Sequence, residues 1–289
     1  KYVSGNDTQA ANVVITAADI WEKPNAHVVD VKNNRIVIYG SDTDSVFHGV
    51  STLKMMFSSF EGKKFPAVHI EDFASVESRG FIEGFYGAWN HQARMDLMRF
   101  AKDYKMNSYI YAAKNDSYHT SNWAVLYPED KIKEFEELVQ VGEETKVRFG
   151  WSVHMGSFFA GLTIPNDEVM ASEEYATLTQ YDLYRTRYAQ LIAKFKQLNE
   201  IGVKRFDILN DDFGSGSHSD VVLVLNRINK DLKALGCESI TYCPQGYNRA
   251  WAGGNNGPWA ELEAMQNLDP DIKIYWTGDD VNAPVTQDT

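Results

Sequence analysis

The sequence is poor in cysteine: its 289 residues include only Cys237 and Cys243. Two cysteines cannot build the network of disulfides that holds many small secreted domains together, and the sequence leaves open whether these two pair. It also has no run of about 18 apolar residues, which a membrane-spanning helix would need. We therefore expect a fold stabilised by a hydrophobic core, with no membrane span.

Positive charge is also scarce, since 28 Lys and Arg residues face 40 Asp and Glu residues, for a net charge of −12. A polyanion would be repelled, so nucleic acid is not expected as a partner. In contrast, 44% of residues are hydrophobic and 13% are aromatic, too apolar for a disordered chain. Aromatic side chains either fill cores or offer flat surfaces to sugars, and composition alone does not decide between these roles.

Residues 1–78 read as a small α/β domain with no catalytic cluster. Two β-type runs, 27–31 and 35–39, flank Lys32-Asn33-Asn34, which predicts a hairpin. A helix should follow, capped by Ser41 or Asp42. Its apolar residues recur at helical spacing from Val46 to Phe57.

From residue 79 onward, predicted strands and helices alternate, a pattern typical of parallel strands joined by right-handed crossovers. The predicted strands are 80–86, 108–112, 148–154, 205–209, 240–243 and 272–276. The predicted helices are about 91–104, 130–145, 180–200, 219–235 and 258–267.

Polar or glycine-containing clusters follow each of these six strands, which favours a (β/α)8 TIM-type barrel over a doubly wound sheet. Residues 79–289 are fewer than the about 250 residues of a typical barrel, and two strands are missing. The chain also begins at Lys1 rather than at Met. We therefore expect a C-terminally incomplete barrel domain over 79–289, cut from a longer enzyme.

The segment Asn210-Asp211-Asp212-Phe213-Gly214 carries two adjacent carboxylates after an apolar strand. Adjacent side chains reach one pocket only where a strand is ending. Three interpretations fit the segment alone: a loop, an acid/base pair, or a metal site with His218 and Asp220. Neighbouring carboxylates are poorly placed to flank a glycosidic bond from both sides. They suit substrate-assisted catalysis, in which the sugar's own 2-acetamido oxygen attacks C1.

Five ordered segments together resemble glycoside hydrolase family 84, the family of O-GlcNAcases and bacterial β-N-acetylglucosaminidases ("hyaluronidases"). The resemblance covers about residues 28–281 and rests on RGFIEGFYG at 79–87, MNSYIYAAKND at 106–116, ILNDD at 208–212, YCPQGYN at 242–248 and YWTG at 275–278.

The resemblance implies roles for individual residues. Asp211 matches the aspartate that orients the 2-acetamido group, and Asp212 matches the general acid/base. The matching substrate-binding positions are Gly87, Lys114, Cys243, Tyr247 and Thr277, with Asn115, Asp116 and Tyr118 beside the lysine.

The implied function is that of a retaining exo-β-N-acetylglucosaminidase, which removes terminal GlcNAc, including O-GlcNAc, through an oxazoline intermediate. No cofactor or metal is implied. GlcNAc-containing glycans or glycoproteins are the implied partners, and the implied location is secreted or on a bacterial cell surface.

Several features depart from the family. The segment Ala88-Trp89-Asn90-His91 is one residue shorter than usual, and Gln245-Gly246 replaces a more usual Thr-Glu. Residues 157–180 form a longer connection, which would be a lid, an aglycone-binding loop or a plain surface excursion. The strand that carries further sugar-binding residues is absent. An inactive relative that binds carbohydrate is therefore the alternative function.

We expect His91 and His154 to be structural, and His119 is a candidate for approaching the sugar. A metal-dependent hydrolase using Asp211, Asp212 and His218 ranks below the other functions, because the cluster has no pair of histidines at helical spacing.

Overall fold

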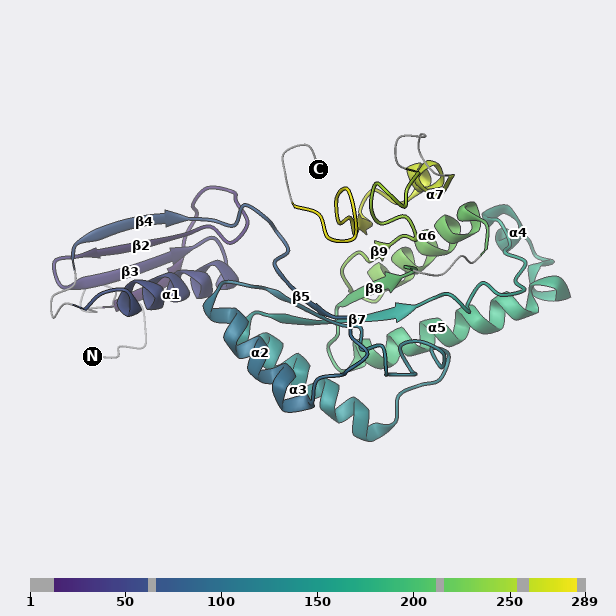
Figure 1. Ribbon diagram of the computed structural model, residues 1–289, viewed down its shortest axis with the longest axis horizontal. Coiled ribbons are helices and arrows are strands. Elements are labelled where there is room, and N and C mark those ends of the chain that lie inside the picture. Colours follow the sequence, from purple (N-terminus) through teal and green to yellow (C-terminus); the bar gives the residue numbers. More distant parts are fainter. Residues whose placement is uncertain (1–12, 62–65, 212–215, 254–259, 285–289) are drawn as a thin grey trace. The chain divides into compact units, whose positions relative to one another are not determined.

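The computed structural model describes residues 13–61, 66–211, 216–253 and 260–284 (Figure 1). The chain forms two compact units. One contains the described residues up to Phe81 together with His91–Tyr109 and Gln140–Arg148. The other contains Ile82–Asn90, Ile110–Val139 and the described residues from Phe149 onward.

The first sheet has four strands in the order β1-β3-β2-β4. They are β1 (Val13–Ala17), β2 (His27–Lys32), β3 (Arg35–Gly40) and β4 (Val68–Asp72). The predicted hairpin is confirmed, because β2 and β3 pair antiparallel across a turn whose residues Asn33 and Asn34 have φ of 51° and 60°. Two consecutive left-handed residues match the twist of the flanking strands. Strands β1 and β4 were not predicted.

Helix α1 (Thr43–Ser58) lies along one face of this sheet (Figure 1). Its predicted cap is confirmed, since the Asp42 carboxylate accepts a hydrogen bond of 2.7 Å from Ser45 N. The apolar face of the helix packs on a core of Val29, Val31 and Ile38. Gly49 allows the close approach, because a Cβ there would lie 2.5 Å from Ile38 Cγ2.

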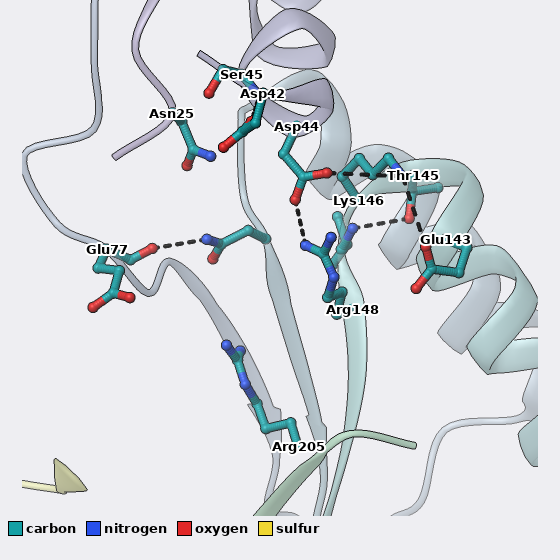
Figure 2. Close-up of polar contacts among 12 residues, drawn as sticks. Asn25, Asp42, Asp44, Ser45, Glu77, Glu143, Thr145, Lys146, Arg148 and Arg205 are labelled. Carbon is teal, nitrogen blue, oxygen red and sulfur yellow. Dashed lines mark hydrogen bonds and ion pairs between the residues drawn. The ribbon is translucent and has the colours of Figure 1, made fainter. Parts of the chain in front are cut away.

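The first turn of α1 is also held by ion pairs within the same unit (Figure 2). Asp44 Oδ2 lies 2.6 Å from Arg148 Nη1, and its other oxygen lies 3.9 Å from Lys146 Nζ. An acidic side chain is favourable at this end of a helix, where unbonded N–H groups concentrate positive potential. Asp44 therefore stabilises α1 and joins it to the start of strand β7.

The second sheet has six strands in the order β10-β9-β8-β7-β6-β5. The pairs β7–β8, β8–β9 and β9–β10 are parallel, as expected. All six predicted strands are present, although β5 and β10 are shorter than predicted. Their bounds are β5 (Gly80–Glu83), β6 (Ser108–Tyr111), β7 (Arg148–His154), β8 (Arg205–Leu209), β9 (Thr241–Cys243) and β10 (Lys273–Ile274).

The predicted helices between these strands are also present, as α2 (His91–Asp103), α3 (Glu129–Thr145), α5 (Asp182–Glu200), α6 (His218–Ala234) and α7 (Ala260–Ala264), the last followed by a 3-10 turn at Met265–Asn267. Among the described residues, no helix has the length and apolar character needed to cross a membrane.

The two faces of the second sheet differ in character. Trp151 of β7 and Phe206 of β8 both pack against Phe195 of α5, at ring-centroid distances of 6.1 and 5.0 Å. Because side chains alternate along a strand, Ser152, His154 and Asp207 lie on the opposite face. One face therefore carries the helix-covered core, and the other carries buried polar groups.

The 157–180 connection contains α4 (Asp167–Ala171) and two 3-10 turns, Tyr175–Thr177 and Thr179–Tyr181. Its aromatic residues Phe158 and Phe159 are 0% and 5% exposed, so they belong to the core and offer no surface to a ligand. Arg187 donates hydrogen bonds of 2.7 Å to the carbonyls of Phe158 and Ala160. These contacts fix the start of the connection on α5.

The left-handed turn predicts a difference between two substitutions at Asn33. Asn33→Gly should leave stability nearly unchanged, because glycine adopts this conformation freely. Asn33→Val should lower the free energy of unfolding by about 1–2 kcal/mol, since a β-branched residue is strained there. Urea denaturation of both variants tests this, and equal stability would argue against a left-handed turn.

Candidate active site

The site is built where strand β8 ends. Asn210 is fixed there, because its backbone N–H donates to Cys243 O at 2.9 Å and its side chain donates to the Tyr242 hydroxyl at 3.4 Å. The next residue, Asp211, turns out of the strand, and its side chain is 23% exposed. Asp212 lies outside the described residues, so its predicted role stays a prediction.

Asp211 is flanked by groups from the ends of two neighbouring strands. Its Oδ2 lies 3.5 Å from Lys114 Nζ, beyond β6, and its Oδ1 lies 3.6 Å from Nε2 of His154, the last residue of β7. Oδ1 is buried and accepts no hydrogen bond from the described residues. Buried carboxylate oxygens are nearly always bonded, so this one is available to a donor from a ligand.

Lys114 and His154 both line a pocket of about 520 Å³. The backbone N–H of Lys114 donates to Phe85 O at 3.1 Å, which fixes the lysine to the connection after β5. Tyr86 from that connection also lines the pocket, and it is 85% exposed. The other lining residues are small or polar: Thr120, Ser121, Gly156 and Ser157.

Asp116, which was predicted to bind substrate, is used inside the protein. Its Oδ2 accepts hydrogen bonds of 2.8 Å from the hydroxyls of Tyr111 and Tyr127. Its Oδ1 accepts one of 2.9 Å from Tyr118 N. The carboxylate therefore shapes the loop that follows Lys114. Asn115 is exposed on that loop.

A buried lysine completes this arrangement. Lys194 of α5 is 0% exposed, and its ammonium group lies over the rings of Tyr127, Tyr118 and Trp151, at 4.0, 5.1 and 5.9 Å from their centroids. Burial lowers the pKa of Lys194 to about 8, although the nearby Asp116 carboxylate opposes the shift. The three aromatic faces offset part of the lost hydration of the cation.

His119 supports the same loop from within. It is 0% exposed, and its Nδ1 lies 2.6 Å from Ser152 O, while its own carbonyl accepts a hydrogen bond from His154 N. Burial lowers the pKa of His119 to about 4. The imidazole is therefore neutral near pH 7 and is buried beside β7 rather than placed to approach a sugar.

Gly87 lies in the exposed connection after β5. Its φ is not positive, and a Cβ built there would meet no described atom within 4 Å. Neither the backbone conformation nor packing among the described residues therefore requires a glycine. Nearby, Trp89 N donates to the buried Glu83 carboxylate at 3.0 Å, which fixes the connection on both sides of Gly87.

The remaining predicted residues, Cys243, Tyr247 and Thr277, follow β9 and β10. Tyr247 is half-buried, its ring lies 5.1 Å from that of Trp251, and its carbonyl accepts a hydrogen bond of 3.0 Å from Thr277 N. Thr277 itself is exposed. Cys243 is a half-buried free thiol, and Cys237 is also free, so the two do not pair.

Two residues beside the site were not predicted to contribute to it. His154 was expected to be structural, yet it lies beside Asp211; its position at the very end of a predicted strand was the available signal. Glu261 of α7 accepts hydrogen bonds from Gln245 N and Gly246 N, at 3.1 and 2.8 Å, and so holds the loop that carries Tyr247. Within the described ranges, no group of three acidic, histidine or cysteine side chains is arranged to bind a metal ion.

Acidification should destabilise the chain partly through His119. Because its pKa is about 4 when folded and about 6.5 when unfolded, the stability it contributes is complete above about pH 6.5 and is lost as the pH falls towards about 4. His119→Gln should therefore lose less unfolding free energy between about pH 7 and about pH 4.5 than the wild type. His69→Gln, at an exposed histidine, is the control; an unchanged loss in His119→Gln would contradict the assignment.

Two family models and several known proteins match the chain. Residues 79–289 match the family model of β-N-acetylglucosaminidase, and residues 1–73 match domain 2 of glycosyl hydrolase family 20. Protein O-GlcNAcase from Mus musculus is 25% identical over 214 residues, which are 69% of this chain and 21% of that protein. The protein from Rattus norvegicus is 25% identical over 215 residues.

Solved structures show the same relationship. CpGH84D is 33% identical with a TM-score of 0.81, over 98% of this chain and 48% of its own. CpGH84B is 32% identical with a TM-score of 0.75, over 92% and 45%. A mutant O-GlcNAc hydrolase from Thermobaculum terrenum is 27% identical with a TM-score of 0.54, over 71% and 42%.

The chain thus spans about a fifth of the mammalian proteins and about half of these solved chains. It shares with CpGH84D an α/β fold whose curled parallel sheet resembles half a barrel; a complete barrel stays a prediction. The chain belongs to glycoside hydrolase family 84, because residues 79–289 match the β-N-acetylglucosaminidase model and because CpGH84D and CpGH84B share its fold.

Proposed function

We propose that this chain carries the catalytic centre of a retaining β-N-acetylglucosaminidase that removes terminal β-linked GlcNAc, including O-GlcNAc, from glycoconjugates. The observation that carries the proposal is the Asp211 carboxylate. It stands at the end of β8, it is flanked by Lys114 and His154, and its buried oxygen Oδ1 accepts no hydrogen bond from the described residues.

Asp211 suits the recognition of an acetamido group. An ionised carboxylate is a strong acceptor, and a hydrogen bond from the substrate N–H to a charged acceptor is stronger than one between neutral groups. The ammonium group of Lys114 lies 3.5 Å from Asp211 Oδ2, and the two opposite charges attract each other. In the proposed complex, Asp211 turns the acetamido oxygen towards C1 and stabilises the positive charge that develops on the amide.

The reaction then proceeds in two steps. The acetamido oxygen forms a bond to C1 while the bond from C1 to the leaving oxygen breaks, and Asp212 donates a proton to that oxygen. The product is a protein-bound oxazoline with its N–H proton passed towards Asp211. Water, deprotonated by Asp212, attacks C1 while the C1–O bond of the oxazoline breaks, and the proton returns from Asp211 to the nitrogen, which restores the acetamido group. Two inversions at C1 give net retention.

The other predicted residues form the proposed sugar site. Lys114 is assigned to a sugar hydroxyl, as well as to Asp211. Gly87 is assigned to backbone contact with the sugar, in keeping with the open space around its Cα. The half-buried Tyr247 and Cys243, together with Thr277, are assigned to the wall around the acetamido methyl group.

The substrate requirement gives the first test of this mechanism. The whole protein that carries this chain should hydrolyse an aryl β-N-acetylglucosaminide and not the matching aryl β-glucoside, because only the former supplies the nucleophile. Added EDTA should not change the rate. Equal turnover of the glucoside would contradict substrate assistance, and binding of the acetamido sugar without turnover would favour the alternative of an inactive carbohydrate-binding relative.

The two aspartates should differ in how their loss depends on the leaving group. Asp211→Asn should lower kcat/KM for every acetamido substrate by at least about a hundredfold, because it removes charge stabilisation of the transition state. Asp212→Asn should cost about 10²–10⁴-fold with poor leaving groups and much less with good ones, which need no proton. Asp271→Asn, at an exposed aspartate paired with Lys233, is the matched control. Equal losses with both kinds of leaving group in Asp212→Asn would contradict its acid role.

A further inference from the structure

A second pocket lies entirely within the unit that contains the β1–β4 sheet, and no role has been assigned to it. Its volume is about 250 Å³. We call it the N-terminal pocket. The side chains that matter for its chemistry come from five segments of the chain: His27, His48, Asp72, Arg79 and Lys105.

The charge of this pocket is opposite in sign to that of the whole chain. Arg79 and Lys105 contribute two positive charges and Asp72 one negative charge, whereas the net charge of the chain is −12. The carboxylate of Asp72, itself a lining residue, lies close to two of the basic side chains. Its Oδ2 lies 2.6 Å from Lys105 Nζ and 3.5 Å from His27 Nε2. One positive charge is left without a carboxylate among the lining residues.

That charge belongs to Arg79, which is held rigidly. Its Nε donates to Lys105 O at 3.0 Å, its Nη1 donates to Val76 O at 2.7 Å, and its Nη2 donates to Asn25 Oδ1 at 2.7 Å. These acceptors are neutral, so they orient the guanidinium group without cancelling its charge. Asn25 and Lys105 both have left-handed backbone, with φ of 53° and 59°. Such conformations persist in non-glycine residues only where the surrounding structure imposes them.

His48 is the least satisfied group in the pocket. It is 1% exposed, and neither of its ring nitrogens has a hydrogen-bond partner in the described part of the chain. Burial lowers the pKa of His48 to about 4, and the positive charges of Arg79 and Lys105 add to the shift. Buried polar groups without partners are rare in native proteins and call for a physical explanation. A bound anion would accept a hydrogen bond from this ring and offset the surrounding positive charge.

We propose that the N-terminal pocket binds an oxyanion group, a carboxylate or a sulfate, through Lys105, His48 and the field of Arg79. Phe73 and Tyr104 also line the pocket and are 45% and 58% exposed, so they offer flat apolar surfaces beside the anion site. A sugar residue that bears the oxyanion fits this combination, since its ring has apolar C–H faces. The proposal does not depend on the catalytic function proposed above.

Isothermal titration calorimetry on the whole chain tests the proposal with four probes: glucuronate, glucose 6-sulfate, inorganic sulfate and uncharged glucose. These sugars lack the 2-acetamido group and so avoid the proposed catalytic site. We expect the charged probes to bind and glucose not to bind. Tighter binding of glucose 6-sulfate than of inorganic sulfate would support a charged sugar as the ligand. Equal binding would support a free oxyanion.

Two variants place the binding in the N-terminal pocket. His48→Phe should weaken glucuronate binding by at least about tenfold, the loss expected for one strong hydrogen bond. Its unfolding midpoint should be unchanged or higher, because the ring nitrogens that it removes are unbonded in the free protein. Lys105→Asn should weaken binding by about tenfold or more, since asparagine tolerates the left-handed backbone but carries no charge.

His69→Gln is the control, because His69 is an exposed histidine of the same sheet that does not line the pocket. It should leave binding unchanged. The proposal is overturned if neither glucuronate nor either sulfate binds, if glucose binds as tightly as the charged probes, or if the affinity is the same in His48→Phe and Lys105→Asn as in the wild type.

Discussion

The geometry around Asp211 depends on one half-buried carboxylate, that of Asp116, which lies two residues beyond Lys114. Two tyrosine hydroxyls and one backbone N–H converge on it, and Lys194 lies over the ring of one of those tyrosines. Burying a carboxylate and a lysine is unfavourable unless each finds partners. Here the partners come from β6, α5 and the loop itself, so the loop has one arrangement in which all are satisfied. That arrangement places Lys114 beside Asp211.

This network explains why neighbouring residues in one motif have different roles. Lys114 reaches the pocket, Asn115 is exposed and Asp116 is turned into the protein. A motif matched along the sequence groups all three as substrate-binding, because adjacency does not show the direction of a side chain. The same applies to Glu261, which is 14 residues after Tyr247 in the sequence but bonds to the two residues just before that tyrosine. Support of this kind comes from tertiary contacts, which no local pattern records.

The elements with strong local signals were predictable. The β2–β3 hairpin has its turn asparagines, α1 has its cap at Asp42, and the strands from β6 to β9 are apolar runs between polar ends. Strand β1 was missed because its partner, β3, lies about twenty residues away and most of its residues are exposed, so its pattern carries little burial signal. His154 was expected to be structural, and its place beside Asp211 could not be read from the sequence, because the alternation along β7 shows which face it occupies but not which residue beyond the neighbouring strand it contacts. The position of Asp212 relative to these groups is still a prediction from the motif.

Buried polar atoms without hydrogen-bond partners distinguish the two proposed sites from the residues that support them. Asp116, Glu261 and Arg79 use their bonding capacity within the chain, and they position other residues. Asp211 Oδ1 and both nitrogens of His48 are buried and have no hydrogen-bond partner in the described part of the chain. An unmet partner alone does not define a site, since Asp207 Oδ2 is also unbonded; burial raises the pKa of Asp207 to about 6 and Tyr275 bonds its other oxygen. Asp211 and His48 differ from Asp207 because basic side chains that line a pocket lie next to them. These are His154 and Lys114 beside Asp211, and Arg79 and Lys105 around His48. A buried polar atom without a hydrogen-bond partner therefore indicates a ligand site where charged side chains and a pocket lie beside it. Elsewhere it indicates only a local cost in the free energy of folding.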